Sequence, residues 1–237
     1  IMFGIAAPTE AAALGALGFV AAVLLARLLP FHDYGHLAYW GALAAASLGF
    51  ALVYRFAGRR DPLVSLIVAL GVIVAVLVVD VLFGAPLQLS NPLGYSPLLA
   101  ARFSGYGNLA YAALASAAVL LAGLLAHRIG GRRGVLTAIA LLVVVFLADG
   151  APMWGSDVGG VLSILPAFAA TGYLLLGKRI RLGTALLGLV AAVIALVAFG
   201  LFDLTRPSDK QTHLGRLFET TESRGWSGFS TVIERKI

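Results

Sequence analysis

The run Pro62-Leu-Val-Ser-Leu-Ile-Val-Ala-Leu-Gly-Val-Ile-Val-Ala-Val-Leu-Val-Val-Asp-Val-Leu-Phe83 decides the fold class of this chain. It is a continuous apolar block, interrupted by Ser65 and Asp80. Such a block is long enough to cross a hydrocarbon core of about 30 Å as a helix. The strands of a membrane β-barrel instead alternate polar and apolar residues over about ten positions. Residues 62–83 therefore predict a transmembrane helix.

The whole chain has the composition of an integral membrane protein. Of its 237 residues, 60% are hydrophobic and 12% are charged, and the mean hydropathy is +0.97. A soluble domain would need far more polar surface. Further apolar runs can be drawn at 11–30, 36–57, 107–126, 134–149, 158–177 and 182–203. We therefore predict an all-α polytopic membrane protein, with about seven transmembrane helices in residues 1–204 and an amphipathic, extracytoplasmic tail at 205–237.

Basic residues cluster in three of the short segments between these runs, and Lys and Arg accumulate on the cytoplasmic side of a membrane. The clusters are Arg55, Arg59 and Arg60; His127, Arg128, Arg132 and Arg133; and Lys178, Arg179 and Arg181. We expect these segments to be cytoplasmic and the segments 28–35, 84–106 and 150–157 to face outward with the tail. The net charge of +6 is then explained by topology and by contact with anionic membrane lipids. Nucleic acid is not expected as a partner.

Three helices that run outward each end in an aspartate, namely Asp80, Asp149 and Asp203. An ionisable group in or near hydrocarbon costs at least ~2.5 kcal/mol, so each should face the bundle interior, a water-filled cavity or a cation. The candidate cations on that side are Arg102, Arg206, Lys210 and Arg216. The alternative is that each aspartate lies among lipid head groups. Three aspartates on one side favour a shared polar site.

Two polar turns repeat each other 66 residues apart. They read Gly84-Ala-Pro-Leu-Gln-Leu-Ser-Asn91 and Gly150-Ala-Pro-Met-Trp-Gly-Ser-Asp157, and Gly94 and Gly160 extend the match. Because the offset crosses two helices, the copies have the same orientation and form a parallel repeat. Such repeats often flank a binding site in transporters. Coincidence in a chain rich in Gly, Ala and Pro is the alternative.

The outer segment 91–108 is too apolar to be a solvated linker. Its helix-breaking residues are Pro92, Gly94, Pro97, Gly105 and Gly107. Irregular backbone at membrane depth is tolerated only where it is buried in protein or lines a cavity. We therefore predict a re-entrant or capping segment, beneath which Arg102 and Asn108 line one outward-facing pocket with Asp149 and Asp157.

The tail after Thr205 is charged and amphipathic. Its apolar residues Leu214, Leu217 and Phe218 fall on one helical face, so the tail is expected to lie along the outer surface. His213 and Arg216 are one turn apart, and both could reach an anionic group at the rim of the pocket. A purely amphipathic surface helix is the alternative.

Metal ions and cofactors are not expected. The chain has no cysteine, which excludes disulfides and thiolate ligands. His32 and His36 lie one turn apart if helical and would form half of a metal site, but no third ligand is evident nearby. Interfacial histidines more often belong to an aromatic belt. The sequence contains no glycine-rich phosphate loop and no nucleophile elbow. These motifs therefore do not identify an enzyme, and the sequence leaves open whether the chain is one.

A second pattern consists of pieces spread over most of the chain. They are Gly94-Tyr-Ser-Pro97, Ala101-Arg-Phe-Ser-Gly-Tyr-Gly-Asn108, Asp149-Gly-Ala-Pro-Met-Trp-Gly-Ser-Asp-Val-Gly-Gly160, Arg206-Pro207 and Thr212-His-Leu-Gly-Arg216. These pieces resemble the membrane half of a bacterial family of multi-pass proteins whose extracytoplasmic half is alkaline-phosphatase-like. The resemblance implies the bacterial plasma membrane and interest in Arg102, Asn108, Asp149, Asp157, His213 and Arg216. The metal ligands of the phosphatase-like half are not in this sequence, so no hydrolase activity is implied.

Both ends of the chain look cut, since it starts at Ile1 and stops at Ile237 where an amphipathic helix has only begun. We therefore expect a longer native polypeptide, with an extracytoplasmic domain attached as in the family that it resembles.

A shorter stretch at the start, Phe3-Gly-Ile-Ala-Ala-Pro-Thr-Glu-Ala-Ala-Ala-Leu-Gly15, is similar to a segment of the large membrane subunit of TRAP-type solute transporters. It consists mostly of Ala and Gly, and nothing downstream continues it. This similarity makes solute transport the runner-up function.

Three classes of function follow. The first is a membrane protein that binds or processes an anionic, lipid-linked cell-envelope substrate in the outward-facing pocket. Arg102, Arg206 and Arg216 would be the partners of its phosphate or carboxylate, with Asp149 or Asp157 as base or cation ligand. The second class is a proton- or cation-coupled solute transporter that uses Asp80, Asp149 and Asp203. The third is a non-catalytic subunit of a larger membrane assembly, held by partner subunits. The predicted site residues are Asp80, Asn91, Arg102, Asn108, Asp149, Asp157, Asp203, Arg206, His213 and Arg216.

Overall fold

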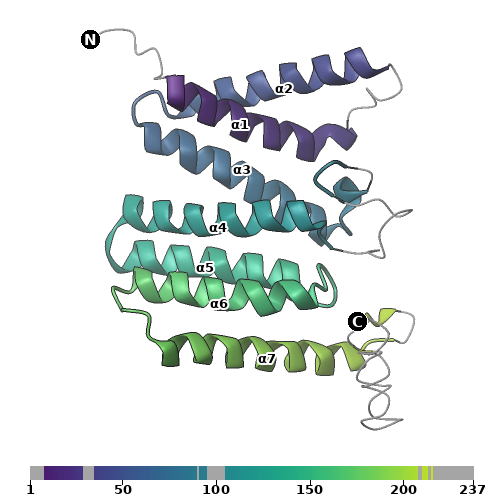
Figure 1. Ribbon diagram of the computed structural model, residues 1–237, viewed down its shortest axis with the longest axis vertical. Helices are drawn as coiled ribbons and strands as arrows, with labels where there is room; N and C mark the ends of the chain where they lie inside the picture. Colours follow the sequence, from purple (N-terminus) through teal and green to yellow (C-terminus); the bar gives the residue numbers. More distant parts are fainter. Residues whose placement is uncertain are drawn as a thin grey trace. The chain divides into compact units, whose positions relative to one another are not determined.

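The structure is a computed structural model that describes residues 8–28, 35–89, 91–94, 105–207, 210–212 and 215. Within these residues it forms seven α-helices and no strand (Figure 1). The helices are α1 (Pro8–Leu25), α2 (His36–Ala57), α3 (Pro62–Leu82), α4 (Asn108–Ile129), α5 (Gly131–Gly150), α6 (Val158–Leu175) and α7 (Leu182–Leu204), with short 3₁₀ turns η1 (Ala26–Leu28) and η3 (Pro86–Gln88). All seven helices are long and apolar enough to span a membrane. The prediction of an all-α multi-pass membrane protein is confirmed.

The connection between α4 and α5 is shorter than the sequence suggested. Gly130 and Gly131 both adopt positive φ, at 71° and 56°, a conformation that glycine reaches without steric cost. The reversal therefore needs few residues, and the basic pair Arg132 and Arg133 begins α5 instead of forming a loop. A helix does not have to stop where its apolar run stops.

The chain divides into two compact units, residues 1–145 and 146–237, with the boundary inside α5. In the first unit α1 packs against α2 and α3, and α3 packs against α4. The buried side chains of Leu14, Tyr54 and Ala69 join the first three helices. α1 and α2 approach closely at Gly18, where an added Cβ would lie 3.2 Å from the backbone nitrogen of Ala51. Small residues thus allow helices to meet without a thick layer of side chains.

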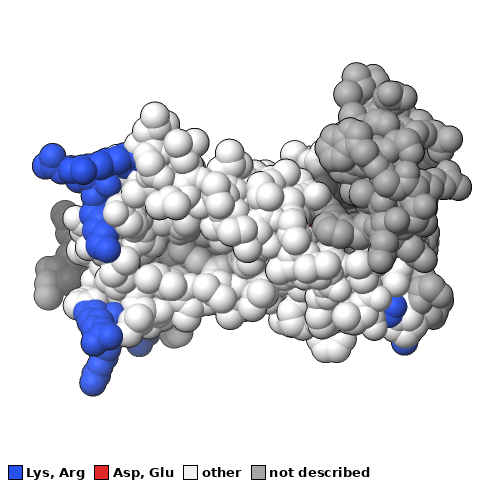
Figure 2. Space-filling model, turned by 90° about the horizontal axis from the view of Figure 1, so that it is seen from below, with Lys and Arg blue, Asp and Glu red and all other residues white. Residues whose placement is uncertain are grey.

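In the second unit α6 and α7 form a packed antiparallel hairpin. The end of α5 joins it, since the rings of Phe146 and Phe199 stack with their centroids 5.8 Å apart. Large apolar side chains remain exposed along α7, including Leu187 at 68%, as expected for a helix in contact with lipid. Figure 2 shows a visible face without charged side chains along its middle.

Candidate functional site

Asp80, in the last turn of α3, is buried and closes the turn that follows the helix. Its Oδ1 atom accepts a hydrogen bond from the backbone nitrogen of Leu87 at 2.8 Å, and its Oδ2 atom accepts one from the side-chain nitrogen of Gln88 at 3.0 Å. Ala85 makes this return possible by adopting a left-handed conformation with φ 58°. Both oxygens of Asp80 therefore bind the chain's own turn.

Two glycines allow the neighbouring backbone to stack on Gln88. A Cβ on Gly94 would overlap the carbonyl oxygen of Gln88, and a Cβ on Gly107 would overlap that of Gly94. The side-chain oxygen of Gln88 accepts a hydrogen bond from the backbone nitrogen of Gly107 at 3.4 Å, and the Ala110 nitrogen donates to the Leu93 carbonyl at 2.9 Å. Leu93 thus supplies a partner to the first turn of α4, while the prediction of a re-entrant or capping segment over a pocket rests mainly on residues 95–104, outside the described part of the chain.

The same turn is tied to the end of α1 by Asn91 and Arg27. Asn91 donates from Nδ2 to the carbonyl of Val23 at 2.8 Å and accepts from the Leu93 nitrogen at 2.9 Å. Arg27 donates to the carbonyls of Pro86 and Leu89 at 2.8 and 2.9 Å. The last carbonyls of a helix need partners from outside it, and Asn91 supplies one. Sequence reasoning missed Arg27, whose signal is a single basic residue at a helix end predicted to face outward.

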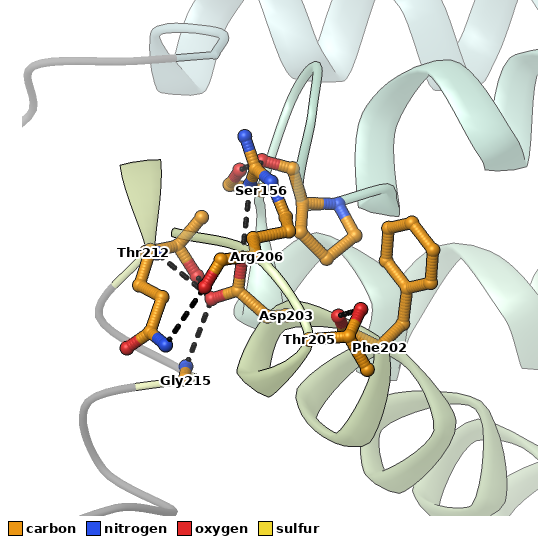
Figure 3. Close-up of polar contacts among 9 residues, drawn as sticks. Ser156, Phe202, Asp203, Thr205, Arg206, Thr212 and Gly215 are labelled. Carbon is orange, nitrogen blue, oxygen red and sulfur yellow. Dashed lines mark hydrogen bonds and ion pairs between the residues drawn. The ribbon is translucent and has the colours of Figure 1, made fainter. Parts of the chain in front are cut away.

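Asp203, near the end of α7, is fully buried and accepts hydrogen bonds from residues that follow the helix (Figure 3). Its Oδ1 atom accepts from Arg206 at 3.0 Å. Its Oδ2 atom accepts from the Thr212 nitrogen at 2.8 Å, from the Thr212 hydroxyl at 2.6 Å and from the Gly215 nitrogen at 3.0 Å. Arg206 also donates to the carbonyl of Pro152 at 2.8 Å, which ties the turn between α5 and α6 to the end of α7.

Thr212 and Gly215 were missed as members of this cluster. They belong to the stretch Thr212–Arg216 that the family resemblance drew attention to, but its charged members were chosen instead. The available signal was a hydroxyl residue and a glycine that follow an aspartate at a helix end. The structure explains the glycine, because a Cβ on Gly215 would overlap Oδ2 of Asp203.

Asp149 and Asp157 both lie next to Gly160 at the start of α6. The Oδ1 atom of Asp157 accepts from the Gly160 nitrogen at 2.8 Å and so caps the helix, a role that suits aspartate. A Cβ on Gly160 would overlap Oδ2 of Asp149 and would lie 2.9 Å from the carboxyl carbon of Asp157. The backbone nitrogen of Asp157 donates to the Asp149 carbonyl at 3.1 Å. The two buried carboxylates therefore lie close together.

The two similar turns have different hydrogen bonds. The first uses the carboxylate of Asp80 and a left-handed Ala85. In the second, Ser156 is the left-handed residue with φ 54°, and Gly155 donates to the Ala148 carbonyl at 3.0 Å. The internal repeat is not visible in these hydrogen bonds and stays a prediction from sequence.

The predicted residues thus fall into several groups. The structure brings together Asp149 with Asp157 and Asp203 with Arg206, and it buries Asp80 and Asn91 in the turn after α3. Asn108 begins α4 and is exposed. Arg102, His213 and Arg216 lie outside the described residues, and so does His32. The shared pocket of Arg102, Asn108, Asp149 and Asp157 stays a prediction.

The described residues include no group of three or more His, Cys, Asp or Glu side chains placed to hold a metal ion. Apolar grooves lie between α1 and α2 and between α6 and α7, with volumes of about 430 and 330 Å³, and the candidate carboxylates line neither of them. Comparison of the chain with protein-family models, with curated proteins and with solved structures finds no match.

Proposed function

We propose that this protein is a non-catalytic membrane scaffold. This is the third of the three classes, a non-catalytic subunit of a larger membrane assembly. Its helices anchor an assembly of the bacterial cell envelope in the plasma membrane and hold the segment after α7 in a fixed position. The observation that carries this proposal is Asp203, whose two oxygens bind Arg206, Thr212 and Gly215. A carboxylate engaged by this many donors orders the chain and has little capacity left for a substrate.

The turn after α3 supports the same proposal. Asp80 is engaged by Leu87 and Gln88, and Asn91 by Val23 and Leu93. A transporter would move a proton or cation through carboxylates exposed to a water-filled path, whereas these groups are fixed to the local backbone. The resemblance to a membrane half that accompanies an extracytoplasmic domain also fits a scaffold.

The second candidate is the binding or processing of an anionic, lipid-linked envelope substrate. It is favoured by the pair Asp149 and Asp157, because two carboxylates beside one glycine can share a proton or a cation. In this function His213 and Arg216, which the sequence predicts to reach an anionic group, would bind the phosphate or carboxylate of the substrate.

A distance measurement tests the scaffold. Spin labels are attached to cysteines introduced at Ser156 and Gln211 in the otherwise cysteine-free chain, and the distance distribution is measured by electron paramagnetic resonance. The scaffold requires a narrow distribution that Asp203→Asn broadens, because the amide nitrogen of asparagine presents hydrogens to donors. A distribution that is broad before any substitution overturns the proposal.

Asp157→Asn is the matched variant that separates the two candidates. Asparagine caps a helix about as well as aspartate, so the scaffold predicts unchanged label distances and stability. Substrate binding at the carboxylate pair instead predicts that Asp157→Asn abolishes the thermal stabilisation of the full chain by a long-chain lipid phosphate. If that lipid stabilises the unaltered chain and not the variant, the second candidate replaces the scaffold.

A further inference from the structure

The groove between α6 and α7 opens toward the turn that joins these helices. Its volume is about 330 Å³. The residues that line it include Pro166, Ala169, Tyr173, Ala185, Leu187 and Gly188. The groove is almost entirely apolar and is large enough to receive a segment of a linear hydrocarbon chain. The groove therefore matches part of one lipid acyl chain.

Small residues keep the groove open. Gly188 faces Pro166 closely enough that an added Cβ would lie 3.5 Å from the Pro166 Cα atom. On both sides of this contact the helices carry alanines, such as Ala169 and Ala185, whose side chains are too short to fill the space. Interiors of folded proteins are close-packed, so an apolar groove of this size at the lipid-facing surface requires an occupant from outside the unit.

The groove ends in a cluster of positive charge. The Lys178 ammonium lies 5.2 Å from the centroid of the Tyr173 ring, and Tyr173 lines the groove. Arg179 and Arg181 belong to the same exposed turn. The acidic residues in the described part of this unit, Asp149, Asp157 and Asp203, all lie at the other ends of α6 and α7. Figure 2 shows Lys and Arg gathered at the end that carries this turn.

We propose that this groove binds one anionic phospholipid, with an acyl chain between α6 and α7 and the phosphate at Lys178 and Arg181. A zwitterionic phospholipid offers the same acyl chain without net charge, so the basic turn selects the anionic head group. The guanidinium of Arg181 is available for this role, because the hydrogen bonds that start α7 use the backbone of Arg181 and the hydroxyl of Thr184.

The test uses quenching by brominated lipids in vesicles that contain the full chain. A fluorescent maleimide is attached to Leu187→Cys, an exposed position on α7 that lines the groove. Phosphatidylcholine vesicles then receive either brominated phosphatidylglycerol or brominated phosphatidylcholine. A contribution of about 1 kcal/mol per basic residue predicts that phosphatidylglycerol binds at least about fivefold more tightly at this label. Lys178→Gln with Arg181→Gln should bring the preference to about one.

Two controls make the result specific. The pair Arg132→Gln and Arg133→Gln removes the same charge from the start of α5 and should leave the preference at Leu187→Cys unchanged. A label at Leu52→Cys, an exposed position that lines the groove between α1 and α2, should show little preference, because Arg55, the cation that lines that groove, lies 3.4 Å from the carboxylate of Glu10.

Equal quenching by the two lipids at Leu187→Cys overturns the proposal, and so does a preference that persists in the Lys178→Gln and Arg181→Gln double variant. Protection of the label from both lipids that increases with protein density would assign the groove to a second copy of the chain instead. These outcomes do not depend on Asp203, so they are separate from the test of the scaffold.

Discussion

Asp203 holds Thr212 twice through a single carboxylate oxygen. Its Oδ2 atom accepts from the backbone nitrogen of Thr212 at 2.8 Å and from the hydroxyl at 2.6 Å. Hydrogen bonds to a charged group are shorter and stronger than neutral ones, and this pair is made nine residues along the chain from the aspartate. The two hydrogen bonds fix the position of Thr212 relative to the end of α7. A substitution of Thr212 can remove the hydroxyl bond and leave the backbone bond in place.

Thr212→Val removes the hydroxyl bond and keeps the shape and the backbone bond. We expect the free energy of unfolding to fall by about 1.5–3 kcal/mol, the usual contribution of a hydrogen bond to a charged group. Thermal unfolding of the purified protein in detergent measures the change. Thr205→Val is the control, since the Thr205 hydroxyl donates to the Phe202 carbonyl at an exposed position. Equal effects of the two substitutions would contradict the proposed tie.

Gly160→Ala should be strongly destabilising, by several kcal/mol, because the new methyl group would overlap Oδ2 of Asp149 and overpacking forces neighbours to move. Gly183→Ala is the matched control in α7, where nothing lies within 4 Å of an added Cβ. There alanine should be neutral or stabilising by up to about 1 kcal/mol. Melting temperatures of the two variants check the contrast, and a tolerated Gly160→Ala would show that Asp149 is not held there.

Asp80→Asn should destabilise the turn after α3 by about 1–3 kcal/mol, because an amide nitrogen would then face a donor, either the Leu87 nitrogen or Gln88. Adding Gln88→Glu should restore part of the loss. Glutamate can accept from the new asparagine and from the Gly107 nitrogen that Gln88 now binds. A double-mutant cycle on thermal stability measures the coupling. No recovery in the double variant would show that Gln88 is not the essential partner.

The orientation deduced from the basic clusters is tested by cysteine labelling in intact cells. Single cysteines at Arg59 and Arg179 are expected to be protected from an impermeant maleimide, whereas Met153→Cys, which is half exposed in the turn after α5, should react. Permeabilised cells should label all three. Labelling at Arg59 or Arg179 in intact cells, with Met153→Cys protected, would reverse the topology.

The sequence predicted the helices, but not the hydrogen-bond partners of the polar residues at their ends. Apolar length locates a membrane span, so the limits of α2 and α3 were close to the structure. The cost of a charge near hydrocarbon predicts that Asp80, Asp149 and Asp203 turn away from lipid, and all three are buried.

The partners were unpredictable because no periodicity encodes them. Asp80 binds a backbone nitrogen of a turn, and Asp203 binds Thr212 and Gly215, neither of which carries charge. Arginines at conspicuous positions were expected in these roles, and Arg206 takes one, whereas Arg102 and Arg216 lie outside the described residues. Glycine positions such as Gly94 and Gly107 looked like breakers of helix, although their effect is to let backbone approach backbone.

The locality of these bonds has a consequence for biogenesis. The partners of Asp80 follow it by seven and eight residues, and those of Asp203 by three to twelve. Each aspartate therefore meets its donors as soon as the next few residues leave the translocon, before any later helix exists to help. A helix that carries a carboxylate at its end can then enter the bilayer on its own, so the order in which the helices assemble is not dictated by the need to neutralise a charge.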